Sequence, residues 1–291
     1  MAGIDSQQFK EAQRKSWDSA APGWQQCWKT FENGAQTVSD HLAELAKINP
    51  NSRVLDIATG IGEPAITAAK KIRIGNGRGY VLATHMSPQM LSIARQRASS
   101  LDLQQVIEFM DGDAETISLP SSTFDAVLCR WGLMFLPDLR AGLSNIYRSM
   151  VEGGRLAAAV WASPEEVPFI SIVINMVSEQ THKPLLPIKG IPGPFSLADE
   201  HVLKDALVRS RFKDIVTERI NVTFTLGSPQ DYTRFHQAIA AHIRAILANE
   251  TQERKEEIWD AVTAEITRRY GNNSTGSVSI DNEAICVSGT K

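Results

Sequence analysis

One apolar stretch that ends in glycines constrains the fold of this chain more than any other feature. The sequence from Arg53 to Pro64 reads RVLDIATGIGEP, and an Ala- and Ile-rich segment follows it. Glycine adopts positive φ without strain and lets a ligand approach the backbone closely. The stretch therefore predicts a strand, a tight turn and a helix, with a nucleotide-like ligand beside the turn.

Composition and charge exclude several classes of protein. The chain has 291 residues, a net charge of −3, and no block of basic residues that would indicate nucleic-acid binding. Its three cysteines are far apart and form no CxxC pair, which argues against a disulfide framework and a metal site. The polar N-terminus does not resemble a signal peptide, and no apolar run approaches the roughly 20 residues that cross a bilayer. We therefore expect a cytoplasmic protein.

Apolar strand patterns alternate with helical patterns through the first half of the chain. We predict strands at 53–58, 79–84, 105–110, 123–129 and 155–161, and helices at 63–72, 87–99 and 138–151. Such alternation is typical of an α/β fold, in which helices cover both faces of a parallel sheet.

The flanking regions are predicted to be mostly helical. Before the sheet we expect helices at 5–21 and 37–48, interrupted at Ala21-Pro22-Gly23. After it we expect a helix at 169–180, a helix at 197–210, one long strand or a bent strand pair at 212–226, two helices within 229–270 and a short strand at 280–288. The chain thus divides into an N-terminal helical lid (1–49), a ligand-binding core (50–162) and late strands with helical insertions (163–291). A helix packed immovably on the core is the alternative to the lid.

The ends of the predicted strands are where a ligand is expected. In an open α/β sheet, ligands bind outside the carboxyl ends of the strands. The spacing at Gly60 and Gly62 is G-x-G, which is shorter than the dinucleotide fingerprint G-x-G-x-x-G. About 20 residues further on, His85 stands where nucleotide-binding folds usually carry an acidic residue for the ribose. Both observations count against a nicotinamide-dependent oxidoreductase.

Five segments together resemble the class I S-adenosylmethionine-dependent methyltransferases, and more closely the ubiquinone/menaquinone-biosynthesis methyltransferase group. They are VLDIATGIGEP (54–64), ATHMSPQML (83–91), GDAETISLP (112–120), FDAVLCRWGLMFLPD (124–138) and VEGGRLAAAVW (151–161). The resemblance implies a Rossmann-like sheet of seven strands with the last one antiparallel. It also implies S-adenosyl-L-methionine as the cofactor, bound across the strand ends.

The resemblance assigns cofactor contacts to the strand ends. The residues it implies are Asp56, Ala58, Thr59, Gly60 and Gly62 at the first strand, His85 and Met86 at the second, Asp113 and Ala114 beside the adenine, and Arg130 and Trp131 beneath the sulfonium. Two positions depart from the family pattern, since Ala58 replaces a glycine and His85 replaces an acid. Loss of that acid is expected to weaken ribose binding by about 1–3 kcal/mol, the cost of a charged hydrogen bond.

The acceptor is expected to be a small, partly apolar molecule that is methylated on carbon, oxygen or nitrogen. Trp24, Trp28, Trp131 and Phe135 are the residues expected to contact it. No catalytic base can be assigned from the sequence, although His236 and His242 lie on the inserted helices and are candidates. The alternative is a protein that keeps this fold, binds the cofactor weakly or structurally, and catalyses a non-methylating reaction. A homo-oligomer is possible through the flanking helices.

Overall fold

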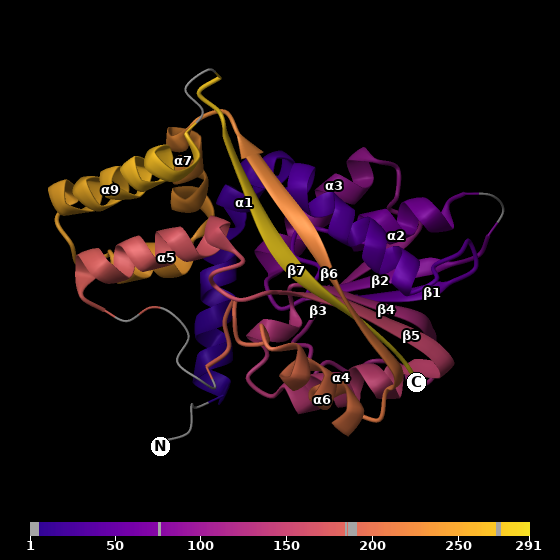
Figure 1. Cartoon of the computed structure of the whole chain (residues 1–291). Helices are drawn as coiled ribbons and strands as arrows, with labels where there is room; N and C mark the ends of the chain where they lie inside the picture. Colours follow the sequence, from indigo (N-terminus) through magenta and orange to yellow (C-terminus); the bar gives the residue numbers. More distant parts are fainter. Residues whose placement is uncertain (1–5, 75–76, 184, 186–190, 272–274) are drawn as a thin grey trace.

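A seven-stranded sheet runs through the centre of the computed structural model, which describes residues 6–74, 77–183, 185, 191–271 and 275–291 (Figure 1). Its strands are β1 (Arg53–Ile57), β2 (Tyr80–His85), β3 (Ile107–Asp111), β4 (Phe124–Arg130), β5 (Met150–Trp161), β6 (Lys213–Leu226) and β7 (Val278–Thr290). They lie in the order β3-β2-β1-β4-β5-β7-β6. The last strand, β7, is antiparallel to both of its neighbours, so the predicted fold class is confirmed.

The central strands are apolar along almost their whole length because helices cover both faces of the sheet. In β1 every residue after Arg53 is buried. Leu55 pairs with Leu82 of β2 and with Val127 of β4, so these three parallel strands end at the same edge. The register therefore brings the glycine turn, His85 and Arg130 to one side of the molecule.

Helices with well-defined N-termini flank this central sheet. The helices that follow its strands are α2 (Ala65–Ile72), α3 (Pro88–Ser100), α4 (Leu139–Ser149) and α6 (Glu200–Arg209). Ser87 begins α3 by accepting a hydrogen bond from the Met90 amide, and Asp138 does the same for the Ala141 amide in α4. Figure 1 shows α2 and α3 on one side of the sheet and α4 and α6 on the other.

The N-terminal region is one helix, α1 (Ser6–Leu45), where the sequence predicted two. Pro22 lacks an amide hydrogen and so removes one hydrogen bond, but its ring faces solvent. The neighbouring Ala20 and Ala21 are fully buried. Packing of these two residues directly before the proline thus outweighs the missing bond, and the predicted break at 21–23 is wrong.

The late part of the chain also differs from the prediction in its details. The helix α5 (Pro168–Thr181) and the long strand β6 are as expected, whereas the region 229–270 forms three helices: α7 (Pro229–Ile239), α8 (Ala241–Ile246) and α9 (Gln252–Tyr270). Gly153 and Gly154 lie inside β5 and do not end a helix. Figure 1 shows α5, α7 and α9 grouped together beside the sheet. In the described part of the chain, no helix has both the length and the apolarity needed to cross a membrane.

The contact between α1 and α7 depends on a glycine. A Cβ added to Gly23 would lie 2.1 Å from the carbonyl oxygen of Ala238. We expect Gly23→Ala to lower the free energy of unfolding by about 1–3 kcal/mol, because overpacking outweighs the gain of up to about 1 kcal/mol in helix propensity. Urea unfolding measures this difference, and Gln26→Ala, at an exposed site on the same helix, is the control. A stabilised Gly23→Ala protein would contradict the close contact.

Candidate functional site

A cavity of about 630 Å³ lies at the carboxyl ends of the parallel strands. The strand ends line it with Ala58, Thr59 and Gly60 after β1, His85 and Met86 after β2, Gly112, Asp113 and Ala114 after β3, and Arg130, Trp131 and Gly132 after β4. Helices α1, α5, α7 and α8 contribute the remaining walls. Its size lies within the range of about 300–1,000 Å³ that is usual for small-molecule sites.

The glycine turn after β1 exposes its backbone to this cavity. Gly60 has φ +58°, and an added Cβ would meet no atom within 4 Å. Thr59 carries a buried hydroxyl group without a hydrogen-bond partner. By contrast, Gly62 packs against Ala94 of α3 and does not line the cavity. Gly60 and Ile61 are therefore the residues of the turn that a ligand can reach.

Asp56 lies behind this turn and shapes it. Its Oδ2 accepts a hydrogen bond of 2.9 Å from the Ala65 amide at the start of α2, and its Oδ1 has no partner. Burial desolvates the carboxylate and raises the pKa of Asp56 to about 7. The carboxyl group supports the turn and is not among the residues that line the cavity.

His85 lines the cavity as a neutral hydrogen-bond donor. Its Nδ1 accepts a hydrogen bond of 3.0 Å from the Ser87 amide. Burial lowers the pKa of His85 to about 4, so the ring is neutral at pH 7 and carries its proton on Nε2. An acidic residue at this place would accept hydrogen bonds from a ribose, whereas His85 donates one.

The carboxylates after β3 are paired with the N-terminal helix. Lys10 of α1 forms ion pairs with Asp113, at 2.7 Å, and with Glu115. Nearby, Trp17 of α1 packs edge-on against both His85 and Phe135. Helix α1 thus covers the end of the cavity formed by β2 and β3.

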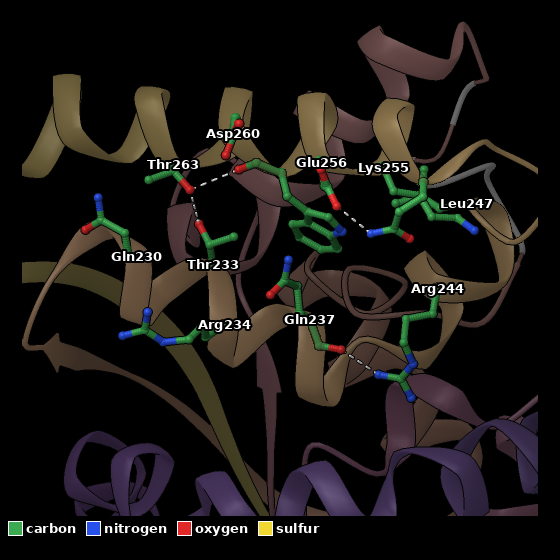
Figure 2. Close-up of a pocket in the computed structure, with 12 residues that line it drawn as sticks. Gln230, Thr233, Arg234, Gln237, Arg244, Leu247, Lys255, Glu256, Asp260 and Thr263 are labelled. Atoms are coloured by element: carbon green, nitrogen blue, oxygen red, sulfur yellow. Dashed lines mark hydrogen bonds between the residues drawn. The ribbon is translucent and has the colours of Figure 1, made fainter.

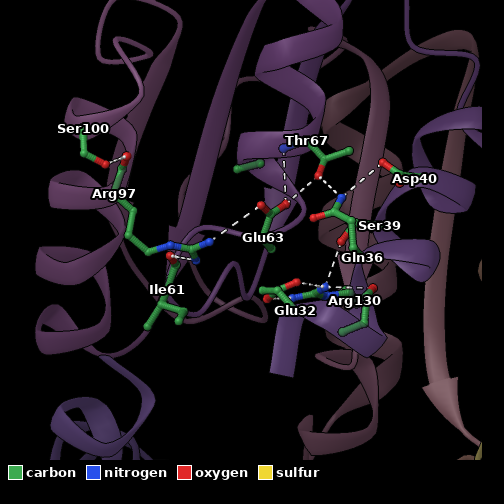
Figure 3. Close-up of polar contacts among 12 residues, drawn as sticks. Glu32, Gln36, Ser39, Asp40, Ile61, Glu63, Thr67, Arg97, Ser100 and Arg130 are labelled. Carbon is green, nitrogen blue, oxygen red and sulfur yellow. Dashed lines mark hydrogen bonds and ion pairs between the residues drawn. The ribbon is translucent and has the colours of Figure 1, made fainter. Parts of the chain in front are cut away.

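Arg130 is part of a buried ion pair that the sequence did not predict (Figure 3). Its guanidinium donates two hydrogen bonds, of 2.6 and 2.8 Å, to the carboxylate of Glu32 in α1, and one of 2.8 Å to Ser39. Glu32 neutralises the charge of Arg130, and the expected place of Arg130 beneath a sulfonium stays a prediction. The residue lines the cavity, but its main contact joins β4 to α1.

Glu63 is a second carboxylate of the cavity that the sequence analysis missed. It accepts hydrogen bonds from the amide and hydroxyl of Thr67, and its ion pair with Arg97 measures 3.8 Å (Figure 3). Burial and the nearby Glu32 raise the pKa of Glu63. Its place directly after the glycine turn was a signal for a role in the site, whereas nothing in the sequence pointed to Glu32.

The opposite half of the cavity is aromatic. Phe31 packs edge-on against Trp24 at 5.0 Å and against Trp131 at 5.5 Å between ring centroids. Trp131 has φ +58°, which is rare for a bulky residue, and its ring stacks on Trp161 at 4.2 Å. Phe135 also lines the cavity. These rings form a surface suited to a flat apolar ligand.

Trp28 does not belong to this aromatic surface. Its ring packs beneath Arg97, whose guanidinium carbon lies 4.3 Å from the ring centroid, and it is absent from the cavity lining. Because Trp24 and Trp28 are one helical turn apart and share a face of α1, the sequence predicted the same role for both, whereas only Trp24 lines the cavity. The expected contact of Trp28 with the acceptor is corrected accordingly.

The two candidate histidines line the same cavity, and desolvation lowers both pKa values, that of His242 to about 4, so both rings are neutral at pH 7. His236 in α7 is 3% exposed and lies among the rings of Phe169, Tyr232 and Phe235. Burial lowers the pKa of His236 to about 3, so its ring is neutral at pH 7. His242 in α8 is exposed.

A second hollow of about 550 Å³ lies between α7, α8 and α9 (Figure 2). Its lining is mostly polar, and several of these groups bond to one another, such as Thr233 with Thr263 at 2.6 Å and Gln252 with Glu256 at 2.7 Å. It includes no residue from the strand ends, so the larger cavity is the candidate site.

The larger cavity fits S-adenosylmethionine in several respects. The open backbone at Gly60 and the unpaired hydroxyl of Thr59 provide close approach and a polar contact. Glu63 adds a carboxyl group to the cavity wall directly after the turn. His85 and Asp113 lie at the ends of neighbouring strands, where a ribose and an adenine amine find polar partners.

Comparison with known sequences agrees with this site. Residues 54–154 match the family model described as "Methyltransferase domain". A demethylmenaquinone methyltransferase of Deinococcus radiodurans is 36% identical over 112 residues, which cover 38% of this chain and 44% of that protein. A ubiquinone/menaquinone biosynthesis C-methyltransferase of Pseudomonas putida is 30% identical over 147 residues, covering 50% of this chain and 52% of that protein. The chain thus spans about half the length of these relatives.

Comparison with solved structures supports the fold. A Bacillus halodurans protein assigned as a methyltransferase is 21% identical, with a TM-score of 0.58 over 88% of this chain and 99% of that one. A phosphoethanolamine N-methyltransferase of Haemonchus contortus, solved with S-adenosyl-L-methionine, is 17% identical. Its TM-score is 0.57 over 97% of this chain and 60% of that one. The cyclase SpnF is 18% identical, with a TM-score of 0.52 over 88% of this chain and 81% of that one. With the family match, the resemblance to class I methyltransferases similar to the ubiquinone/menaquinone group is confirmed.

The Glu32–Arg130 pair is predicted to be essential for stability. Glu32→Gln leaves a buried guanidinium without its counter-charge, so we expect the free energy of unfolding to fall by about 3–5 kcal/mol. Glu44→Gln, at an exposed site on the same helix, is the control. Equal losses in the two variants, measured by urea unfolding, would contradict the role of the pair.

Asp56 is predicted to make stability depend on pH. Because its folded pKa of about 7 lies above the ordinary value of 3.8, the folded state holds a proton that the unfolded chain releases. Its contribution is complete below about pH 4 and is lost as the pH rises to 7. Asp56→Asn cannot ionise, so its stability relative to the unmodified protein should increase by at most about 4 kcal/mol across this window. Urea unfolding at several pH values measures the difference, and a constant difference would contradict the raised pKa.

Proposed function

We propose that this protein transfers a methyl group from S-adenosyl-L-methionine to a small, partly apolar acceptor. One observation carries the proposal: the larger cavity combines a polar half, built from the strand ends, with an aromatic half. The methyltransferase domain match over 54–154 supports the cofactor. The names of the relatives support an aromatic acceptor of the quinone type and methylation on carbon.

The residues of the site have separable roles in this proposal. S-adenosylmethionine supplies a methyl group that the positive sulfonium already activates. Glu63 would lie beside the methionine part of the cofactor, His85 would donate to a ribose hydroxyl, and Asp113 would accept from the adenine. The aromatic half orients the acceptor for in-line attack, and proximity and alignment provide most of the acceleration. Helix α1 acts as the lid that excludes water.

The remaining sequence predictions belong to the same proposal. The region 1–49 serves as the lid, and the helices within 163–291 form the acceptor side of one domain. The protein acts in the cytoplasm and binds no nucleic acid, and a homo-oligomer is compatible with this arrangement.

Titration calorimetry tests cofactor binding directly. We expect S-adenosylmethionine and S-adenosylhomocysteine each to bind with micromolar affinity. No heat with either compound at high micromolar concentration would refute the proposal. If S-adenosylmethionine binds but no quinol tested converts it to S-adenosylhomocysteine, the result would favour the alternative, a non-methylating reaction. The departure at His85 and the likeness to a cyclase keep that alternative open.

Gly60→Ala is predicted to weaken cofactor binding specifically. The new Cβ would enter the space beside the open backbone, so we expect affinity for S-adenosylmethionine to fall about 10-fold, equivalent to about 1.4 kcal/mol. Gly153→Ala is a matched control, because Gly153 also has positive φ and open surroundings but lies outside the cavity. Both variants should lose similar stability. Equal affinities in the two variants would contradict the assigned role of Gly60.

A further inference from the structure

Three side chains that line the cavity each carry a buried ring nitrogen without a hydrogen-bond partner. They are Nε1 of Trp24, Nε1 of Trp131 and Nε2 of His236. Buried polar groups in folded proteins are nearly always paired, and each exception requires an explanation. All three nitrogens belong to the aromatic half, away from the glycine turn.

The unpaired nitrogen of His236 is an acceptor. Hydrogen bonding to the main chain of Phe169 favours the protonated ring, so the imidazole is the donor in that contact. A neutral imidazole has one donor and one acceptor nitrogen. Because Nε2 is the nitrogen without a partner, it presents a lone pair. The ring centroid of Tyr232 lies 4.4 Å from that of His236, but the Tyr232 hydroxyl donates its hydrogen bond to the carbonyl oxygen of Phe169.

The two indole nitrogens have the opposite character. An indole N–H only donates. Trp24 and Trp131 both pack against Phe31, and Phe31 in turn stacks on Phe235, which contacts His236. One continuous group of aromatic rings thus carries two donors and one acceptor.

We infer that His236 determines specificity, by accepting a hydrogen bond from a hydroxyl group on the ring of the acceptor molecule. The indoles of Trp24 and Trp131 donate to oxygen atoms of the same ring. The inference rests on the proposed function for the identity of the cavity as the acceptor site. A ring whose hydroxyl is replaced by an ether leaves Nε2 unpaired, and a site built for a hydroxyl rejects such analogues strongly.

This role differs from that of a general base. The ring of His236 is desolvated and resists protonation, so it is a poor destination for a proton. A neutral acceptor can nevertheless orient a hydroxyl group throughout the neutral pH range. His201, which is exposed in α6 and does not line the cavity, serves as the comparison.

Binding of 1-naphthol and 1-methoxynaphthalene tests the inference, because these rings differ only in the hydroxyl hydrogen and its methyl replacement. Calorimetry with the full chain should show at least about 10-fold preference for 1-naphthol. His236→Phe keeps an aromatic ring in place and should reduce the preference to less than about 3-fold. His201→Phe, at the exposed site outside the cavity, should retain it. His236→Asn, which keeps a polar group near the Nδ1 position, replaces the phenylalanine variant if that one does not fold.

The outcomes separate this inference from the proposed function. Retention of the hydroxyl preference in folded His236→Phe or His236→Asn protein, or equal affinities in the unmodified protein, would overturn the role of His236. Calorimetry with S-adenosylmethionine on the same preparation tests independently whether the protein binds this cofactor. A preference that depends on His236 without any cofactor binding would support the specificity role and refute methyl transfer.

Discussion

The buried ion pair between Glu32 and Arg130 determines how the rest of the molecule is arranged. Arg130 ends the central strand β4, and Glu32 lies near the middle of α1. Two charges removed from water are tolerated only when their geometry is good and their remaining hydrogen bonds are satisfied. The contacts of Arg130 with Ser39 and the carbonyl of Ala35 meet this condition. The pair therefore fixes α1 across the strand ends, and the cavity exists because the helix lies there.

Two kinds of chemistry meet in this cavity because two parts of the chain build it. The parallel strands supply backbone edges, His85 and carboxylates, as expected where several strands end at one edge. The N-terminal helix and the late helices supply aromatic rings. Trp131 joins the two halves, and its positive φ indicates that the loop after β4 is held in a strained conformation by its surroundings.

The sequence predicted the parts of the fold that depend on local pattern. The glycine turn, the alternating strands and the antiparallel last strand were recognisable because their spacing and composition are repeated features of one family. The continuity of α1 through Pro22 was not predictable, since burial of Ala20 and Ala21 decides it. The partner of Arg130 was hidden for a similar reason: Glu32 lies 98 positions away in the chain.

The single unbroken α1 has a consequence for ligand binding. Lys10 and Trp17 touch the strand ends of β2 and β3, whereas Trp24 and Phe31 belong to the aromatic half, all on one rigid element. Any displacement of this helix that admits one ligand also alters the surface offered to the other. The two affinities are then linked by a coupling free energy, which must be equal in both directions. Binding of the cofactor would thus change the affinity for the acceptor, and the reverse, without any direct contact between the two ligands.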